Sequence, residues 1–157
     1  MSFTFTELLS GVGDMWQRMS PDNSLNHFRL ENWVLYHSKG EKAGQALPSM
    51  YERGTPKECF KNAGQHALWN NSLTYCEGFA ISKRLGIPIH HAWLVDGDGG
   101  VIDTTWSDPE ECTYLGVEFP TSFLKRWTFK NKYWGLLSSD WGVNVDVMKD
   151  FERVTGQ

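Results

Sequence analysis

Three side chains of this sequence have the types needed for thiol chemistry: Cys59, His91 and Asp103. A cysteine attacks a carbonyl carbon once its proton is removed, a histidine accepts that proton, and an aspartate holds the imidazole in one tautomer. We therefore take these residues as the catalytic candidates of the chain. The elements predicted around them indicate whether the three can meet.

Cys59 follows a signal for the start of a helix. Thr55 has the type of a capping residue, Pro56 would occupy the first helical position, and Glu58 completes a capping box. We expect a helix from Thr55 to about Trp69, with the cysteine in its first turn. Free backbone N–H groups and the helix dipole there favour a thiolate and can receive an oxyanion. A cysteine among apolar helical neighbours is also compatible with a core position, and both interpretations stay open.

His91 and Asp103 lie on the two strands of a predicted β-hairpin, which turns through a segment rich in glycine and aspartate at 96–100. If Val95 pairs with Gly99 across a three-residue loop, His91 lies directly opposite Asp103 and the two side chains share one face. A four-residue loop would put them on opposite faces. Because an aspartate within an apolar strand costs free energy unless it is paired, its presence favours the contact.

The other elements complete an α+β pattern. Helical periodicity favours a helix at 5–19, whereas 26–37 fits a helix or a strand equally well. Asn70 to Ser72 resembles a cap, and Gly86 a helix end, for a second helix after Cys59. We expect helices at 5–19, 55–69, 73–85 and 120–130, strands at 89–95, 101–106 and 113–119, and irregular chain at 38–54. This order predicts N-terminal helices packed on an antiparallel sheet.

Composition limits the classes of function. The chain has 157 residues, the size of one domain, and a formal net charge of −4 with no basic run. We therefore expect a single domain over 1–157 and no nucleic-acid partner, since phosphate binding needs a basic face. No apolar stretch approaches the ~18 residues that span a bilayer, so no membrane partner is expected. Three cysteines without disulfide-type spacing, and no signal peptide, predict a cytoplasmic location.

The motifs and their order resemble the transglutaminase-like superfamily, whose members share a papain-like Cys-His-Asp arrangement. The matching segments are Cys59-Phe60-Lys61-Asn62-Ala63, Glu77-Gly78-Phe79-Ala80, His91-Ala92-Trp93 and Asp103-Thr104-Thr105-Trp106. The chain is also similar to small bacterial and phage proteins of unassigned function. The resemblance implies a papain/transglutaminase-like core at about 55–119. It departs from the family beside Cys59, which lacks a neighbouring tryptophan, and Gln45 lies far upstream of the place of a papain-type oxyanion glutamine.

Five further side chains are candidates for substrate binding: Asn62, Glu77, Trp93, Trp106 and Tyr114. Asn62 lies one helical turn after Cys59. Glu77 falls on the second predicted helix, where it either reaches the site or is solvated, and the adjacent Gly78 indicates close helix packing. For the two tryptophans a core position is the main alternative. We expect His90 to be structural.

The predicted function is that of a thiol enzyme acting on an amide, ester or related acyl bond, as a hydrolase or an acyltransferase, without a cofactor. Its substrate would be a peptide, a peptidoglycan fragment or a small-molecule conjugate. A non-catalytic binding module on the same scaffold, such as a phage or defence-related inhibitor, is the alternative. Zinc binding by the cysteines, His90 and His91 is another, although the sequence has no C-x-x-C or H-x-x-x-H pair.

Overall fold

The structure is a computed structural model that describes residues 4–19, 29–139 and 142–156. It is an α+β fold in which five α-helices pack on an antiparallel, nearly closed sheet of five strands. The helices are α1 (Phe5–Met19), α2 (Leu30–His37), α3 (Cys59–Trp69), α4 (Thr121–Asn131) and α5 (Val145–Thr155). The strands of the sheet are β1 (Lys42–Ala43), β2 (Thr74–Ser82), β3 (Pro88–Val95), β4 (Val101–Ile102) and β5 (Cys112–Phe119). A 3-10 turn, η2 (Pro109–Glu111), precedes β5, and β6 (Ser138–Ser139) pairs with β7 (Gly142–Val143).

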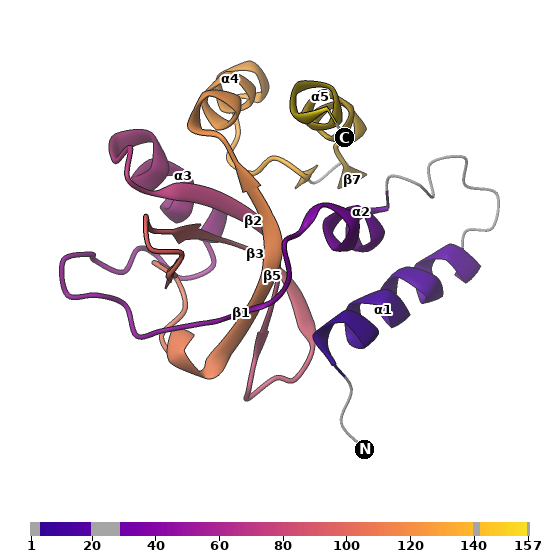
Figure 1. Cartoon of the computed structure of the whole chain (residues 1–157), viewed down its shortest axis with the longest axis horizontal. Coiled ribbons are helices and arrows are strands. Elements are labelled where there is room, and N and C mark those ends of the chain that lie inside the picture. Colours follow the sequence, from indigo (N-terminus) through magenta and orange to yellow (C-terminus); the bar gives the residue numbers. More distant parts are fainter. Residues whose placement is uncertain (1–3, 20–28, 140–141, 157) are drawn as a thin grey trace.

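The sheet has the strand order β1-β5-β2-β3-β4, so β2 lies at its centre. Alternate residues of β2 define two faces, because successive side chains of a strand point to opposite sides. The helix face carries Tyr75, Glu77 and Phe79, and its apolar core includes residues of all five α-helices, which are arranged in an arc along the sheet (Figure 1). This one core holds the helices and the sheet together.

The inner face of the sheet carries Cys76 and Ala80 of β2 together with Trp93 of β3 and Tyr114 of β5. These residues form a second, smaller apolar cluster. Gln45, just after β1, donates from its side-chain amide to the carbonyl of Val101 in β4 over 3.0 Å. Since β1 and β4 are the two edge strands, this hydrogen bond links the two edges and helps the sheet to curve toward closure.

Most of the predicted elements are confirmed, including α1, the strands β3 and β5, and the helix α4. The helix predicted at 73–85 is wrong, because these residues form β2. The signals that flank this segment serve turns instead: the Asn70 side chain accepts from the backbone of Ser72, and Gly86 follows a turn with a left-handed φ of 68°. The central position of β2 between two partners outweighs those local signals.

Two predicted boundaries are also wrong. The helix α3 begins at Cys59 rather than Thr55, because a turn with Lys57 at a φ of 68° precedes it, and the cap residue Glu58 makes no side-chain capping bond. The strand β4 ends at Ile102 rather than continuing to residue 106. In the 26–37 segment, Leu30–His37 is helical and residues 26–28 lie outside the described part of the chain. Among the described residues, none of the helices combines the length and the apolar character needed to cross a membrane.

Candidate active site

Cys59 is the first residue of α3, so the prediction that it lies in the first turn of a helix is confirmed. The first intrahelical hydrogen bond runs from the N–H of Asn62 to the carbonyl of Glu58, over 2.9 Å. The N–H groups of Cys59 and the next two residues therefore have no acceptor within the helix. Lys57, two residues before the cysteine, has left-handed backbone geometry, which is strained for a residue with a side chain. The strained turn sets the direction in which α3 starts.

His91 projects from the inner face of β3 and joins the other two candidates. Its Nε2 lies 2.9 Å from Oδ2 of Asp103, and the thiol of Cys59 is close enough to the imidazole to raise its pKa. Because Asp103 occupies Nε2, Nδ1 is the ring nitrogen left for the thiol. The structure thus places the imidazole between the thiol and the carboxylate, which is the predicted order.

Burial and hydrogen bonding act in opposite directions on this pair. Burial alone would lower the pKa of His91, but the hydrogen bond to Asp103 and the nearby Cys59 outweigh it and raise that pKa to about 9. Burial would likewise raise the pKa of Asp103, yet the bonds from His91, Tyr114 and the backbone hold it below its usual value. The two shifts favour an imidazolium beside a carboxylate at neutral pH.

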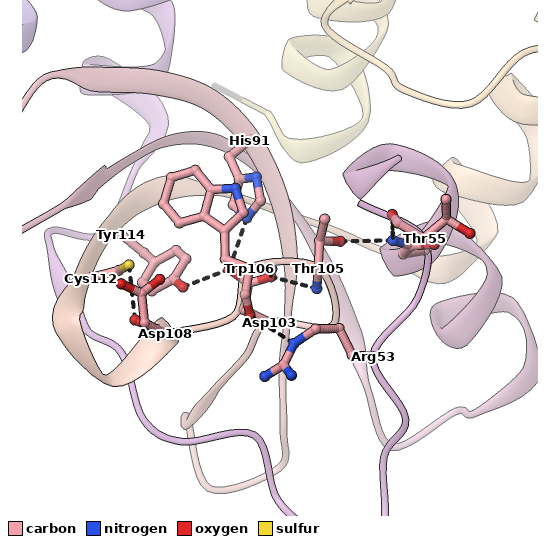
Figure 2. Close-up of polar contacts among 10 residues, drawn as sticks. Arg53, Thr55, His91, Asp103, Thr105, Trp106, Asp108, Cys112 and Tyr114 are labelled. Carbon is pink, nitrogen blue, oxygen red and sulfur yellow. Dashed lines mark hydrogen bonds and ion pairs between the residues drawn. The ribbon is translucent and has the colours of Figure 1, made fainter. Parts of the chain in front are cut away.

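Asp103 directly follows β4, and its side chain stabilises the turn after the strand. Its Oδ1 accepts the N–H groups of Thr105, over 2.9 Å, and Trp106, over 3.1 Å. These bonds replace the strand ladder, which explains why the strand stops at Ile102. The same turn carries Trp106 onto the imidazole of His91, with ring centroids 4.1 Å apart and planes at 25° (Figure 2). The indole therefore covers the ring that connects the thiol and the carboxylate.

Tyr114 supports the same carboxylate from β5. Its hydroxyl donates to Oδ2 of Asp103 over 2.6 Å, and the side chain is fully buried (Figure 2). Tyr114 is one of the candidates for substrate binding, and in the structure it is a hydrogen-bond donor within the network of the aspartate. Both β3 and β5 pair with β2, and this pairing puts His91 and Tyr114 on the same inner face of the sheet. The contact of Tyr114 with Asp103, the partner of His91, could be predicted only from that pairing.

Asn62 joins the helix of the cysteine to the turn of the aspartate. Its Nδ2 donates to the carbonyl of Thr55 over 2.9 Å and to the hydroxyl of Thr105 over 3.0 Å. Gly54 lies so close that a Cβ there would come within 2.3 Å of the Asn62 amide oxygen, which only a glycine avoids. Asn62 is thus buried and holds two segments of the site together.

Glu77 and Trp93, two of the candidates for substrate binding, are both buried and lie on opposite faces of the sheet. Glu77 is fully buried on the helix face of β2, and it accepts the N–H groups of Leu136 and Leu137, each over 2.7 Å. The neighbouring Gly78 allows close approach of strands, not helices, because a Cβ there would lie 2.5 Å from Cα of Gly116 in β5. Trp93 is buried on the inner face.

The sulfur and imidazole groups suggested for zinc are dispersed. Over residues 4–19, 29–139 and 142–156, no three His, Cys, Asp or Glu side chains gather in an arrangement that would hold a metal ion. Cys76 and Cys112 lie in the inner cluster, whereas Cys59 lies in the core of the helix face. His90 faces away from His91 and bonds to Glu77 over 3.2 Å.

A comparison of this chain with protein-family models, with curated proteins and with solved structures finds no match. The function must therefore be inferred from the geometry of the site.

Proposed function

We propose that this chain is a cysteine-nucleophile enzyme with a papain/transglutaminase-like core, acting on an amide, ester or related acyl bond. The observation that carries the proposal is the position of the His91 imidazole, whose Nε2 is held by Asp103 and whose pKa is raised by both Asp103 and the nearby thiol of Cys59. A buried imidazole with a carboxylate on one nitrogen and a thiol at the other is suited to moving the proton of that thiol.

In the proposed reaction, the sulfur of Cys59 attacks the acyl carbon after its proton passes to His91. The charge that develops on the carbonyl oxygen is stabilised by free N–H groups at the start of α3. His91 then returns the proton to the leaving amine or alcohol, and a thioester forms at Cys59. Water releases the acyl group as an acid, whereas an amine acceptor would receive it as an amide.

The wider context follows from the same proposal. The acyl donor would be a peptide, a peptidoglycan fragment or a small-molecule conjugate, and the triad needs no cofactor. All three cysteines are free thiols, which supports a reducing, cytoplasmic setting.

Acylation by p-nitrophenyl acetate tests the proposal without knowledge of the natural substrate. We expect an acetyl group on Cys59, located by peptide mass mapping, and release of p-nitrophenol that is lost in Cys59→Ala. The matched controls are Cys76→Ser and Cys112→Ser, which should keep the rate. Burial raises the pKa of both control thiols, to about 11 for Cys112, so they are poor nucleophiles at pH 7. If Cys59→Ala keeps the wild-type rate, the proposal is wrong.

Burial of the site supports a second candidate, a non-catalytic binding module such as a phage or defence-related inhibitor. The residue Cys59 is only 8% exposed and His91 only 1%, so a substrate has little access without a local opening. In such a module the three side chains would form a polar network that stabilises the fold. Alkylation of Cys59 by iodoacetamide at a rate no higher than that of Cys76 would favour this candidate over the enzyme.

A further inference from the structure

A groove of about 520 Å³ lies between α3 and the segment 52–54 that precedes it. From α3 its lining includes Asn62, Gln65, His66 and Trp69. Steps of three or four residues put these side chains along one side of the helix. The groove therefore begins at Asn62 and follows α3 to its last residue, Trp69.

The indole of Trp69 lies open at the far end of the groove. It is 88% exposed, whereas Trp33, Trp93 and Trp127 are each 7% exposed or less. An indole offers a large apolar face and one N–H donor. A ligand in the groove can therefore pack on this ring, which is not possible for a ring enclosed in the core.

Asn62 brings a buried polar atom to the near end of the groove. The residue is only 7% exposed, and its amide nitrogen donates to Thr55 and Thr105. Within the described part of the chain, no hydrogen bond reaches its Oδ1. A Cβ at Gly54, which also lines the groove, would lie 2.3 Å from this oxygen, so the glycine leaves it uncovered. A buried amide oxygen without a protein donor is an acceptor for a ligand.

The rest of the lining is polar and balanced in charge. Glu52 contributes one carboxylate and Arg53 one guanidinium, which already donates to two backbone carbonyls. Gln65 and His66 add groups that both donate and accept hydrogen bonds. This lining favours a neutral ligand with several polar groups, because neither sign of charge is in surplus.

We propose that this groove binds an uncharged glycan, with a sugar ring on Trp69 and a hydroxyl or acetamido group donating to Oδ1 of Asn62. A sugar ring has an apolar face of C–H groups and a rim of hydroxyl groups, so it matches an exposed indole beside amide side chains. A peptide fits less well, because peptide sites use a sheet edge, an apolar groove or a charged cluster. The lining here is one side of a helix and a short loop, with a single large apolar side chain.

The groove also indicates which acyl donor the proposed enzyme would take. Cys59 and Trp69 are the first and last residues of α3, about 15 Å apart along the helix. A donor that reaches both is an extended molecule such as a peptidoglycan fragment, with its acyl bond near the thiol and a sugar on the indole. This identification of the donor rests on the proposed function, whereas glycan binding itself does not need the thiol.

Titration of the full chain carrying Cys59→Ala with chitotetraose, a neutral tetramer of N-acetylglucosamine, tests the groove. In ¹H–¹⁵N NMR spectra we expect saturable shifts of the Trp69 indole N–H and the Asn62 side-chain amide. Adding Trp69→Ala should weaken the binding about tenfold, because the ring loses its contact with the sugar. Tyr36→Ala is the matched control: Tyr36 is 76% exposed on α2 but lies outside the groove lining, and its loss should change nothing.

Two results would overturn the groove: chitotetraose that leaves both signals unmoved, or equal affinities for Trp69→Ala and Tyr36→Ala. Binding of the capped peptide acetyl-tetraalanine amide in place of the glycan would overturn the choice of ligand. Both variants remove exposed rings and should keep the fold. Acylation of wild-type Cys59 by p-nitrophenyl acetate without glycan binding would refute only the groove, and glycan binding without acylation would refute only the enzyme.

Discussion

Glu77 and Asp103 are two fully buried carboxylates with nearly the same set of partners on opposite faces of one sheet. Each accepts a tyrosine hydroxyl over 2.6 Å, from Tyr75 for Glu77 and from Tyr114 for Asp103. Each also accepts two backbone N–H groups and lies within hydrogen-bond distance of Nε2 of a histidine. Burial of a carboxylate is thus compensated in the same way twice.

The two networks differ in what the histidine does with its other nitrogen. Nδ1 of His90 lies 3.1 Å from the hydroxyl of Ser138, so both nitrogens of that ring are engaged in structural bonds. For His91, Nδ1 is the nitrogen left for the nearby thiol of Cys59, which helps to raise the pKa of the imidazole. The backbone donors differ too, since those of Glu77 lie 59 and 60 residues away and those of Asp103 only two and three. Glu77 tethers a distant segment, whereas Asp103 shapes a local turn and orients a base.

The largest expected effect is the loss of stability in Glu77→Ala. The substitution leaves two backbone N–H groups, a tyrosine hydroxyl and His90 without their shared acceptor in a buried place. We expect a loss of about 3–5 kcal/mol in the free energy of unfolding, measured by urea denaturation. Glu77→Gln, which keeps one acceptor oxygen, is the control and should lose less. A loss below about 1 kcal/mol in Glu77→Ala would contradict the tethering role.

The pH dependence of stability should distinguish the two histidines. The pKa of His91 is raised from 6.5 to about 9 in the fold, so its protonated form stabilises the native state. This contribution is complete below the unfolded value of 6.5 and is lost as the pH rises through about 9. It amounts to roughly 3 kcal/mol, which urea denaturation across that range would measure.

The comparison of His91→Gln with His90→Gln sharpens this result. The loss of stability with rising pH should disappear in His91→Gln and persist in His90→Gln. If the slope persists in His91→Gln, the stabilising proton does not reside on the imidazole between Asp103 and Cys59.

Asp103→Asn should slow the reaction of Cys59 with iodoacetamide about tenfold at pH 7, because a neutral amide no longer supports an imidazolium at His91. The alkylation rate is measured by mass spectrometry of the Cys59 peptide. Glu77→Gln makes the same chemical change in the other network and should leave the rate unaltered. Equal slowing in both variants would mean that the effect comes from a loosened fold and not from the orientation of His91.

The His91–Asp103 contact could be predicted because the parity of a hairpin is a local property. The proposed pairing of Val95 with Gly99 is wrong, since Val95 pairs with Val101, but a shift of two residues keeps the same face. The loop runs from Gly97 to Gly99. Gly99 closes it with a φ of 84°, a geometry that a glycine adopts without strain.

The role of Glu77 could not be predicted in the same way. Its donors at Leu136 and Leu137 are remote in sequence, and no local pattern couples them to β2. The predicted helix at 73–85 also hides this role, because the capping and stop signals on either side of the segment favour a helix over a strand. In a strand, Tyr75 and Glu77 share a face, and their hydrogen bond follows from that spacing. The segment is a strand because β2 pairs with both β3 and β5, and local sequence signals carry no information about such pairing.

The smallest effect expected separates the two tyrosines. Tyr114→Phe and Tyr75→Phe each remove one hydroxyl donor from a buried carboxylate and should each cost about 1–2 kcal/mol of stability. Only Tyr114→Phe should also raise the pKa of Asp103, which the tyrosine bond helps to keep low. A carboxylate with a lowered pKa stabilises the fold above its unfolded value and loses that contribution as the pH falls, so acid unfolding of Tyr114→Phe should begin at a higher pH than in Tyr75→Phe. Acid titrations followed by circular dichroism measure this onset, and coincident curves would mean that the hydroxyl of Tyr114 is no more than a structural donor.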